Sequence, residues 1–366
     1  MIDDKEKNDQ LVKAKTSSLK LRDTNIVSRG LSDLALLDVE DAEIIDEEKL
    51  LQAREWFKKG FNYLKNETYD KAIEAYTNGI AFDQHYGPAY RNRGIAYAEK
   101  RLFDRAIENY NKAIELEPND AVAYLSLGNA YNKKGQYDRA IEDYNKAIAI
   151  DPNYTQAYNN RGLTYKNKGQ YDRAIEDYNK AIALDPHWGA AFHNRGRAYA
   201  DKGLHNNAIE DYNKAISLDP NGAMAYLNRG NAYANKGQHG SAIEDYNKAI
   251  ALDPNYADAY NNRGLTYDNK RQYDRAIEDF SKALAINPNY AEAYTGRGNA
   301  YYGQGQHDKA IENYNKAIVL DPNNADAYNE RELLMRSWGI GAWQFLIIGR
   351  HVIWGLNLGA RICRGF

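Results

Sequence analysis

Apolar and small residues recur along the chain with a helical period. Within residues 155–188, Tyr158, Gly162 and Tyr165 lie at i, i+4 and i+7, the spacing of one face of an amphipathic helix. A second run at 172–184 places alanine, isoleucine and tyrosine on one side in the same way. The pattern predicts two helices joined by a short turn.

Three residues indicate where these two helices end and begin. Gly169 is suited to a left-handed cap at the end of the first helix. Asp172 falls in the first turn of the second helix, where the helix dipole favours a negative charge. Pro186 cannot continue a helix and ends the second one. The segment is therefore predicted to be a helical hairpin.

The hairpin recurs with a fixed period, because seven prolines lie 34 residues apart: Pro118, Pro152, Pro186, Pro220, Pro254, Pro288 and Pro322. In this frame eight repeats span residues 53–324 and start at Ala53, Gly87, Ala121, Thr155, Gly189, Ala223, Ala257 and Ala291. Position 8 is Gly and position 20 is Ala in every repeat, so the two helices of a hairpin can approach closely. The chain is an array.

The repeat resembles the tetratricopeptide repeat, with an aromatic residue at position 4, Gly at 8, Tyr at 11, Ala at 20, an aromatic at 24, Ala at 27 and Pro at 32. The resemblance implies an all-α fold, a right-handed superhelical solenoid of antiparallel helix hairpins whose first helices line the concave face. The first copy departs from the pattern at Trp56, Gly79 and Gln84, as expected of a terminal repeat.

The flanking segments differ from the array in charge. Residues 1–52 carry 8 basic and 13 acidic residues, the array 53–324 carries 35 of each, and residues 325–366 carry 5 basic and 3 acidic. We expect 1–30 to be a disordered N-terminal segment and 31–52 an acidic helical lead-in, acting either as a solvating cap or as an interaction tail. Residues 325–335 are predicted to form a capping helix.

Residues 336–366 form an apolar, basic tail, for which three interpretations stay open. It could dock on the exposed end of the array, lie at a membrane surface with Arg336, Arg350, Arg361 and Arg364 facing anionic lipid, or have no folded function. Arg350 near its middle disfavours a membrane-spanning helix. The N-terminus lacks the pattern of a signal peptide, so we expect a cytoplasmic protein, or a membrane-peripheral one if the tail binds lipid.

Catalytic chemistry finds no support in the sequence. There is no glycine-rich phosphate loop, no nucleophile elbow and no pair of histidines at metal-ligating spacing, and Cys363 is the only cysteine. We therefore expect a non-enzymatic protein without cofactor or metal. The zero net charge of the array argues against a nucleic-acid partner.

Function is then expected on the surface of the first helices, where positions 2, 6, 9 and 13 face away from the buried side. Positions 6 and 9 are rich in asparagine, and the candidate peptide-binding residues are Asn92, Asn129, Asn160, Asn194, Asn228, Asn231, Asn262 and Asn299. An amide offers both donors and an acceptor, so a row of amides can pair with the backbone of an extended peptide.

The residues at position 6, namely Asn92, Asn160, Asn194, Asn228 and Asn262, resemble the asparagine ladder in the tetratricopeptide superhelix of O-linked N-acetylglucosamine transferase, which holds protein substrates by their backbone. We interpret the chain as an adaptor that binds a protein or peptide segment in its concave groove. The alternatives are that asparagine is merely common at these positions, or that the chain is a membrane-associated assembly scaffold anchored by residues 336–366.

Two further expectations concern the helix surface. Arg occupies position 7 in six repeats, and we expect its stem to cross the tyrosines while its head bonds carbonyls or carboxylates, an anion-binding row being the alternative. Alanine at Asn160, Asn194, Asn228 and Asn262 is expected to weaken partner binding and to leave the thermal midpoint nearly unchanged. Partner identity, pathway and oligomeric state are left open by the sequence.

Overall fold

The computed structural model describes residues 47–337, which form helices joined by short turns, with no strand in that range. The first helices of the hairpins are α2 (Glu47–Lys65), α4 (Gly87–Glu99), α6 (Ala121–Lys133), α8 (Thr155–Asn167), α10 (Gly189–Asp201), α12 (Ala223–Asn235), α14 (Ala257–Asn269), α16 (Ala291–Gly303) and α18 (Ala325–Ser337). The second helices are α3 (Tyr69–Phe82), α5 (Phe103–Leu116), α7 (Tyr137–Ile150), α9 (Tyr171–Leu184), α11 (His205–Leu218), α13 (His239–Leu252), α15 (Tyr273–Ile286) and α17 (His307–Leu320).

The helix ends follow the local chemistry of the sequence. Gly169 has φ +72°, so it is the left-handed residue that was expected after α8. Asp185 caps α9 directly before Pro186, and its side chain accepts a hydrogen bond of 3.0 Å from the backbone N–H of His187. Because the same Asp–Pro turn recurs in most repeats, it gives each hairpin a similar exit direction.

The two helices of each hairpin are held together by a tyrosine that packs on a glycine. A Cβ added at Gly162 would lie only 2.9 Å from Cε1 of Tyr178, which is fully buried. The same pair forms between positions 8 and 24 of the other repeats, with Phe280 replacing tyrosine in the seventh. The tyrosines at positions 4 and 11, such as Tyr158 and Tyr165, are only half-buried, so the innermost layer consists of alanines, glycines and the position-24 rings.

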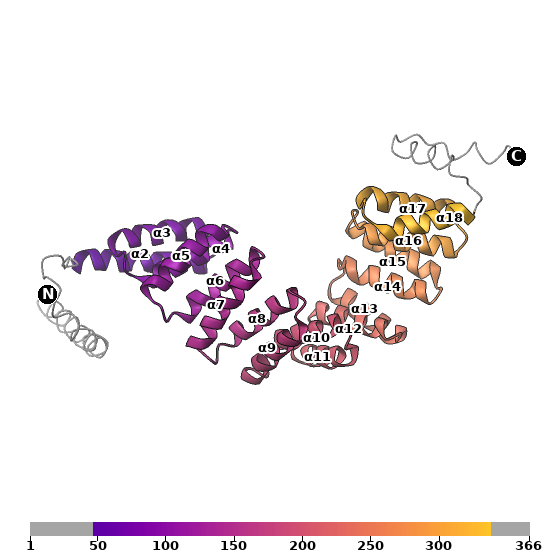
Figure 1. The fold of residues 1–366 in the computed structure, drawn as a ribbon. Coiled ribbons are helices and arrows are strands. Elements are labelled where there is room, and N and C mark those ends of the chain that lie inside the picture. The colour runs from indigo at the N-terminus through magenta and orange to yellow at the C-terminus, as the bar shows by residue number, and fades with distance from the viewer. Residues whose placement is uncertain (1–46, 338–366) are drawn as a thin grey trace, which may run out of the picture.

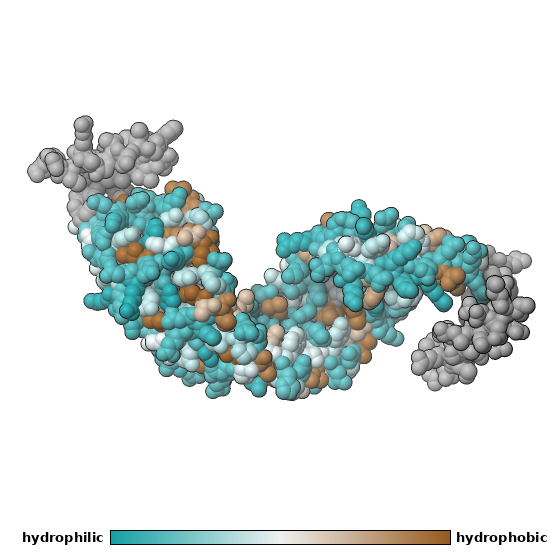
Figure 2. Space-filling model, turned by 180° about the vertical axis from the view of Figure 1, so that it is seen from behind, coloured by the Kyte–Doolittle hydropathy of each residue, from teal (hydrophilic) through white to brown (hydrophobic). Residues whose placement is uncertain are grey.

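Successive hairpins stack into a curved ribbon with α2 at one end and α18 at the other (Figure 1). Each first helix contacts the first helices of the neighbouring repeats, whereas no comparable contact joins second helices within residues 47–337. The ribbon therefore bends toward the first helices, which line its inner face. Figure 2 shows the resulting hollow between the two arms of the molecule. The described chain is an all-α repeat solenoid.

Candidate functional site

The inner face is built from the exposed side of the first helices. We call positions 2, 6, 9 and 13 of these helices the inner stripe. All eight asparagines predicted to bind a peptide lie on it, and each is half-buried: Asn92, Asn129, Asn160, Asn194, Asn228, Asn231, Asn262 and Asn299. The curvature of the ribbon brings their helices side by side along the hollow.

The amides of neighbouring repeats are hydrogen-bonded to one another. Nδ2 of Asn160 donates to Oδ1 of Asn129, one repeat earlier, at 2.8 Å. The hydroxyl of Tyr144 donates to the same oxygen at 2.8 Å, and Asn159 donates to Oδ1 of Asn160 at 3.2 Å. The cluster ties α6 and α7 to α8.

The same cluster recurs three repeats later with nearly the same geometry. Asn262 donates to Asn231 at 2.9 Å, Tyr246 donates to Asn231 at 2.9 Å, and Asn261 donates to Asn262 at 3.1 Å. Because an asparagine at position 9 followed by a pair at positions 5 and 6 of the next repeat occurs in both places, the residue combination, rather than a single position, defines the cluster.

Three more of the predicted asparagines also have hydrogen-bonding neighbours. Asn194 donates to Oδ1 of Asn159 at 2.9 Å, and Asn299 accepts from the hydroxyl of Tyr314 at 2.9 Å. Nδ2 of Asn228 lies 3.2 Å from Nε2 of His193. Burial, and next the charge of Arg197, lower the pKa of His193 to about 4, so the imidazole is neutral at pH 7 and its Nε2 can accept. Four amides thus donate to the preceding repeat.

These bonds change one expectation from the sequence. Asn160, Asn194, Asn228 and Asn262 each bridge two successive repeats, so their replacement by alanine removes contacts that stabilise the stack. The prediction that the thermal midpoint stays nearly unchanged is therefore replaced by a prediction of lower stability. Each bridging Nδ2 uses one of its two hydrogens in the bond described, which leaves the other for a ligand.

Apolar side chains lie between the amides along position 9. Ile95 and Leu163 are half-buried, and Leu265 is 40% exposed. At the two ends of the array this position holds Phe61, 57% exposed, and Leu333, 60% exposed. The stripe therefore alternates amide and apolar groups, which suits a segment that presents both backbone and side chains.

In four of the repeats, the arginine at position 7 forms an ion pair inside its hairpin. Nε and Nη2 of Arg161 donate to the two oxygens of Asp177, at 2.9 and 2.6 Å, and Nη1 donates to Asn145 of the preceding repeat at 2.5 Å. Its guanidinium also lies 5.6 Å from the centre of the Tyr158 ring. The same bidentate pair forms at Arg195, Arg229 and Arg263. The expected contact with a carboxylate is confirmed, and these groups serve the fold.

The third repeat lacks this arginine. Leu127 occupies position 7, and the carboxylate of Asp143 remains almost fully buried with Lys146 at 3.7 Å as its ion-pair partner. Burial raises the pKa of Asp143 to about 6, an effect that Lys146 opposes. The missing arginine is visible in the sequence. That the arginine of other repeats pairs with the aspartate at position 23 is not visible there.

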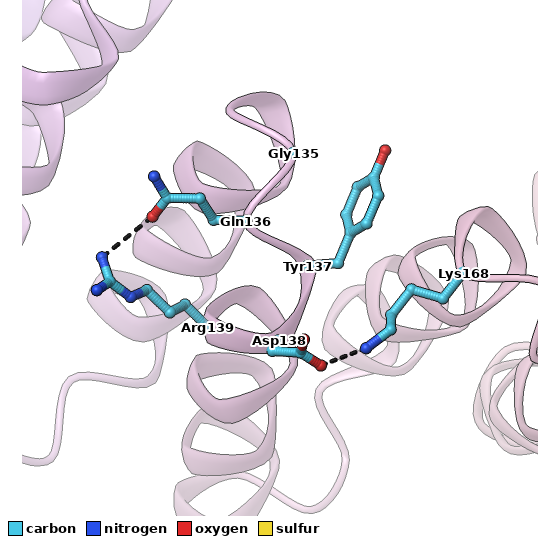
Figure 3. Close-up of a pocket in the computed structure, with 6 residues that line it drawn as sticks. All are labelled: Gly135, Gln136, Tyr137, Asp138, Arg139 and Lys168. Atoms are coloured by element: carbon cyan, nitrogen blue, oxygen red, sulfur yellow. Dashed lines mark hydrogen bonds and ion pairs between the residues drawn. The ribbon is translucent and has the colours of Figure 1, made fainter.

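A depression of the described surface lies at the turns between first and second helices. It has a volume of about 400 Å³ and is lined by Gly135, Gln136, Tyr137, Asp138, Arg139 and Lys168 (Figure 3). Asp138 pairs with Lys168 of the next repeat, and Arg139 donates to Gln136 at 3.1 Å. Because its charged side chains are already paired and it is wide open, it is a weaker candidate than the inner stripe.

The described residues offer neither a metal cluster nor a membrane-spanning helix. Residues 47–337 contain no group of His, Cys, Asp and Glu side chains arranged to hold a metal ion. None of the helices described there combines the length and the apolar character needed to cross a bilayer. The expected N-terminal disordered segment, most of the acidic lead-in and residues 338–366 of the tail lie outside the described residues.

Comparison with known proteins identifies the repeat. Profiles described as "TPR repeat" match residues 103–135, 128–169, 196–237 and 230–270, and one described as "Tetratricopeptide repeat" matches residues 155–187, 257–290 and 291–324. No curated protein matches the chain in sequence.

Several solved structures are similar to this chain. The MamA protein is 37% identical over 47% of this chain and 93% of its own, with a TM-score of 0.42. YrrB, described as a TPR protein with an unusual peptide-binding site, is 29% identical over 51% of this chain and 96% of its own, with a TM-score of 0.43. The Cut9–Hcn1 heterotetramer of APC/C is 20% identical over 73% of this chain and 52% of its own, with a TM-score of 0.56.

The last of these structures shows that the solenoid fold is shared over most of the chain. The profile matches together span residues 103–187 and 196–324, more than half of the sequence, and fall within the range of helices α5 to α17. Such an array is a scaffold for protein–protein interaction. The chain belongs to the tetratricopeptide repeat family.

Proposed function

We propose that the chain is a non-enzymatic adaptor that holds an extended protein or peptide segment against the inner stripe. The observation that carries the proposal is the row of half-buried amides on the inner face, with half-buried or exposed apolar side chains between them. An extended backbone has one donor and one acceptor per residue, and the amides offer matching groups whatever the side chains of the ligand.

The bonds within the row support this role by fixing the amides before a ligand arrives. Asn160 and Asn262 are each held by two neighbouring amides, so their side chains lose little additional freedom on binding. A single segment bound in this way would have a dissociation constant in the micromolar range, about 8 kcal/mol. This range suits an adaptor that exchanges partners.

Photo-crosslinking in the native cell tests the proposal. A photoreactive amino acid at Leu265, on the inner stripe, should capture partner proteins at defined short segments, as mapped by mass spectrometry. The matched control carries the same photoreactive amino acid in place of Asn207, which is exposed on α11. Equal capture at the two positions would refute binding at the inner face.

A second test uses alanine at Asn160, Asn194, Asn228 and Asn262. The variant should lose captured partners at a temperature at which circular dichroism shows it folded. Alanine at Asn111, Asn206 and Asn207, exposed residues of second helices without a side-chain hydrogen bond in the described structure, should retain them. Full capture by the inner-stripe variant would show that these amides do not hold the partner.

A further inference from the structure

The inner stripe changes the sign of its charge along its length. In the first three repeats the stripe has one acidic residue, Glu99. Its other ionised residues there are basic: Arg54, Lys58, Lys65 and Lys133. In the last two repeats and α18 they are all acidic: Asp258, Glu292, Asp326 and Glu330. All are exposed except Glu330, which is half-buried. The zero net charge of the array conceals this separation.

The middle of the stripe, in the fourth to sixth repeats, is nearly uncharged. It holds most of the amides described above, and its two ionised residues are Arg197 and Asp201. Asp201 is already paired with Lys166 at 3.0 Å. The inner face therefore has a basic end, an amide-rich centre and an acidic end.

The charges at the two ends are available for a partner. Within residues 47–337, no ion pair neutralises any of the basic or acidic stripe residues just named at the two ends. Asp258 accepts a hydrogen bond of 2.8 Å from the hydroxyl of Tyr290 but keeps its charge exposed. By contrast, lysines at the turns, such as Lys168 and Lys202, are paired with aspartates of the preceding repeat. Like charges on adjacent helices add their fields over distances near the Debye length.

We propose that the inner stripe selects an extended polypeptide segment with an acidic block and a basic block and binds it in one orientation. The acidic block lies over α2, α4 and α6, a neutral stretch lies over the amides, and the basic block lies over α14, α16 and α18. This inference rests on the proposed function, since it specifies the segment that the inner face holds. A nucleic acid is uniformly negative and would be repelled at the acidic end, so it does not fit this surface.

The test compares two labelled synthetic peptides of equal composition on the full chain. One carries glutamates at one end and lysines at the other, separated by a neutral spacer of varied length, and the other alternates the same residues. Fluorescence anisotropy should show the block peptide binding about tenfold more tightly, since several exposed charge pairs, each weak by itself, act together. The difference should vanish at about 1 M salt.

Matched charge variants localise the effect. Neutralising Asp258→Asn, Glu292→Gln, Asp326→Asn and Glu330→Gln should bring the block peptide to the affinity of the alternating one. Neutralising four exposed glutamates of second helices, Glu108, Glu142, Glu176 and Glu210, should leave the difference intact. Equal losses in the two variants would show a non-specific effect of net charge and overturn the inference.

A photo-crosslinker in each block reports the orientation. A crosslinker beside the glutamates should label α2 to α6, and one beside the lysines should label α14 to α18. If the block peptide and the alternating peptide both label the inner face and bind with equal affinity, the inference is overturned and the proposed function stands. If neither peptide labels the inner face, both proposals fail.

Discussion

Replacement of Asp143 by Asn is expected to stabilise the protein at neutral pH. Asp143 is 6% exposed, and the position-7 arginine that pairs with the equivalent aspartate in four other repeats is Leu127 here. In the second and eighth repeats position 23 is already asparagine: Asn109 and Asn313 donate to the carbonyl four residues earlier, both at 2.8 Å. An asparagine at position 143 can make the same bond without a buried charge.

The size of the effect follows from the raised pKa. The pKa of Asp143 is about 6 in the folded chain, against 3.8 for an unperturbed group. A shift of this size corresponds to roughly 2–3 kcal/mol of lost stability once the group is ionised. Since the folded state binds the proton more tightly than the unfolded state, the parent protein keeps its full stability below pH 4, where Asp143 is protonated. It loses this stability as the pH rises through 6 and the buried carboxyl group ionises. The advantage of the variant should therefore grow from pH 4 to pH 7.

Urea denaturation of the full chain at several pH values, with amide exchange in α6 and α7 as a local readout, measures this difference. Local exchange is needed because repeat arrays need not unfold in one step. The control is Asp245→Asn, which breaks a bidentate pair with Arg229 and should destabilise by about 1–3 kcal/mol. A variant at Asp143 that is no more stable than the parent at pH 7, or whose advantage does not depend on pH, would refute the reasoning.

Three further substitutions, two of them paired with a control substitution, test the helix packing, a turn and a hydrogen bond between repeats. Gly162→Ala should destabilise by about 1–2 kcal/mol in thermal melts, because the new Cβ meets Tyr178 at 2.9 Å, whereas Gly189→Ala, with its nearest neighbour at 3.5 Å, should be neutral or mildly stabilising. Arg271→Gly should raise the stability by roughly 0.5–1 kcal/mol, since Arg271 has φ +58° where five other repeats have glycine; an unchanged urea midpoint would contradict this. Asn160→Ala should cost about 1 kcal/mol through its bond to Asn129, while Asn167→Ala, exposed and unbonded, should cost nothing measurable by calorimetry.

The sequence predicted the architecture because each decisive feature occurs within one hairpin. A proline marks the end of the second helix in every repeat but the first, and the glycine at position 8 leaves room for a ring such as that of Tyr178. The contact between Arg161 and a carboxylate was also predictable, although its partner, 16 residues later at Asp177, required the geometry of the hairpin. Periodicity alone gives the buried side of a helix but not which residues face each other across two helices.

The contacts between repeats could not be predicted in the same way. Bonds such as Asn160 to Asn129 and Asn194 to Asn159 join residues 31 and 35 positions apart, and the choice between them depends on which repeat carries an amide at position 5 or 9. A consensus sequence of the repeat averages over these differences between individual repeats. The charge separation along the inner stripe was missed for the same reason, since Lys58 and Lys133 cancel against Asp258 and Glu292 in any sum over the array.

The recurrence of the amide cluster links stability to recognition. Asn129 and Asn160 in one half of the ribbon, and Asn231 and Asn262 in the other, bond across a repeat boundary, and their spacing is set by the stacking of the hairpins. A ligand backbone would therefore meet donors whose separation is already fixed by the fold, so less ordering accompanies binding than on a surface of free side chains. The same bonds make the amides poor targets for a purely functional substitution, because each alanine removes a stacking contact together with a ligand contact. The exposed charges at the two ends of the stripe lack this coupling and are the sharper means of separating recognition from folding.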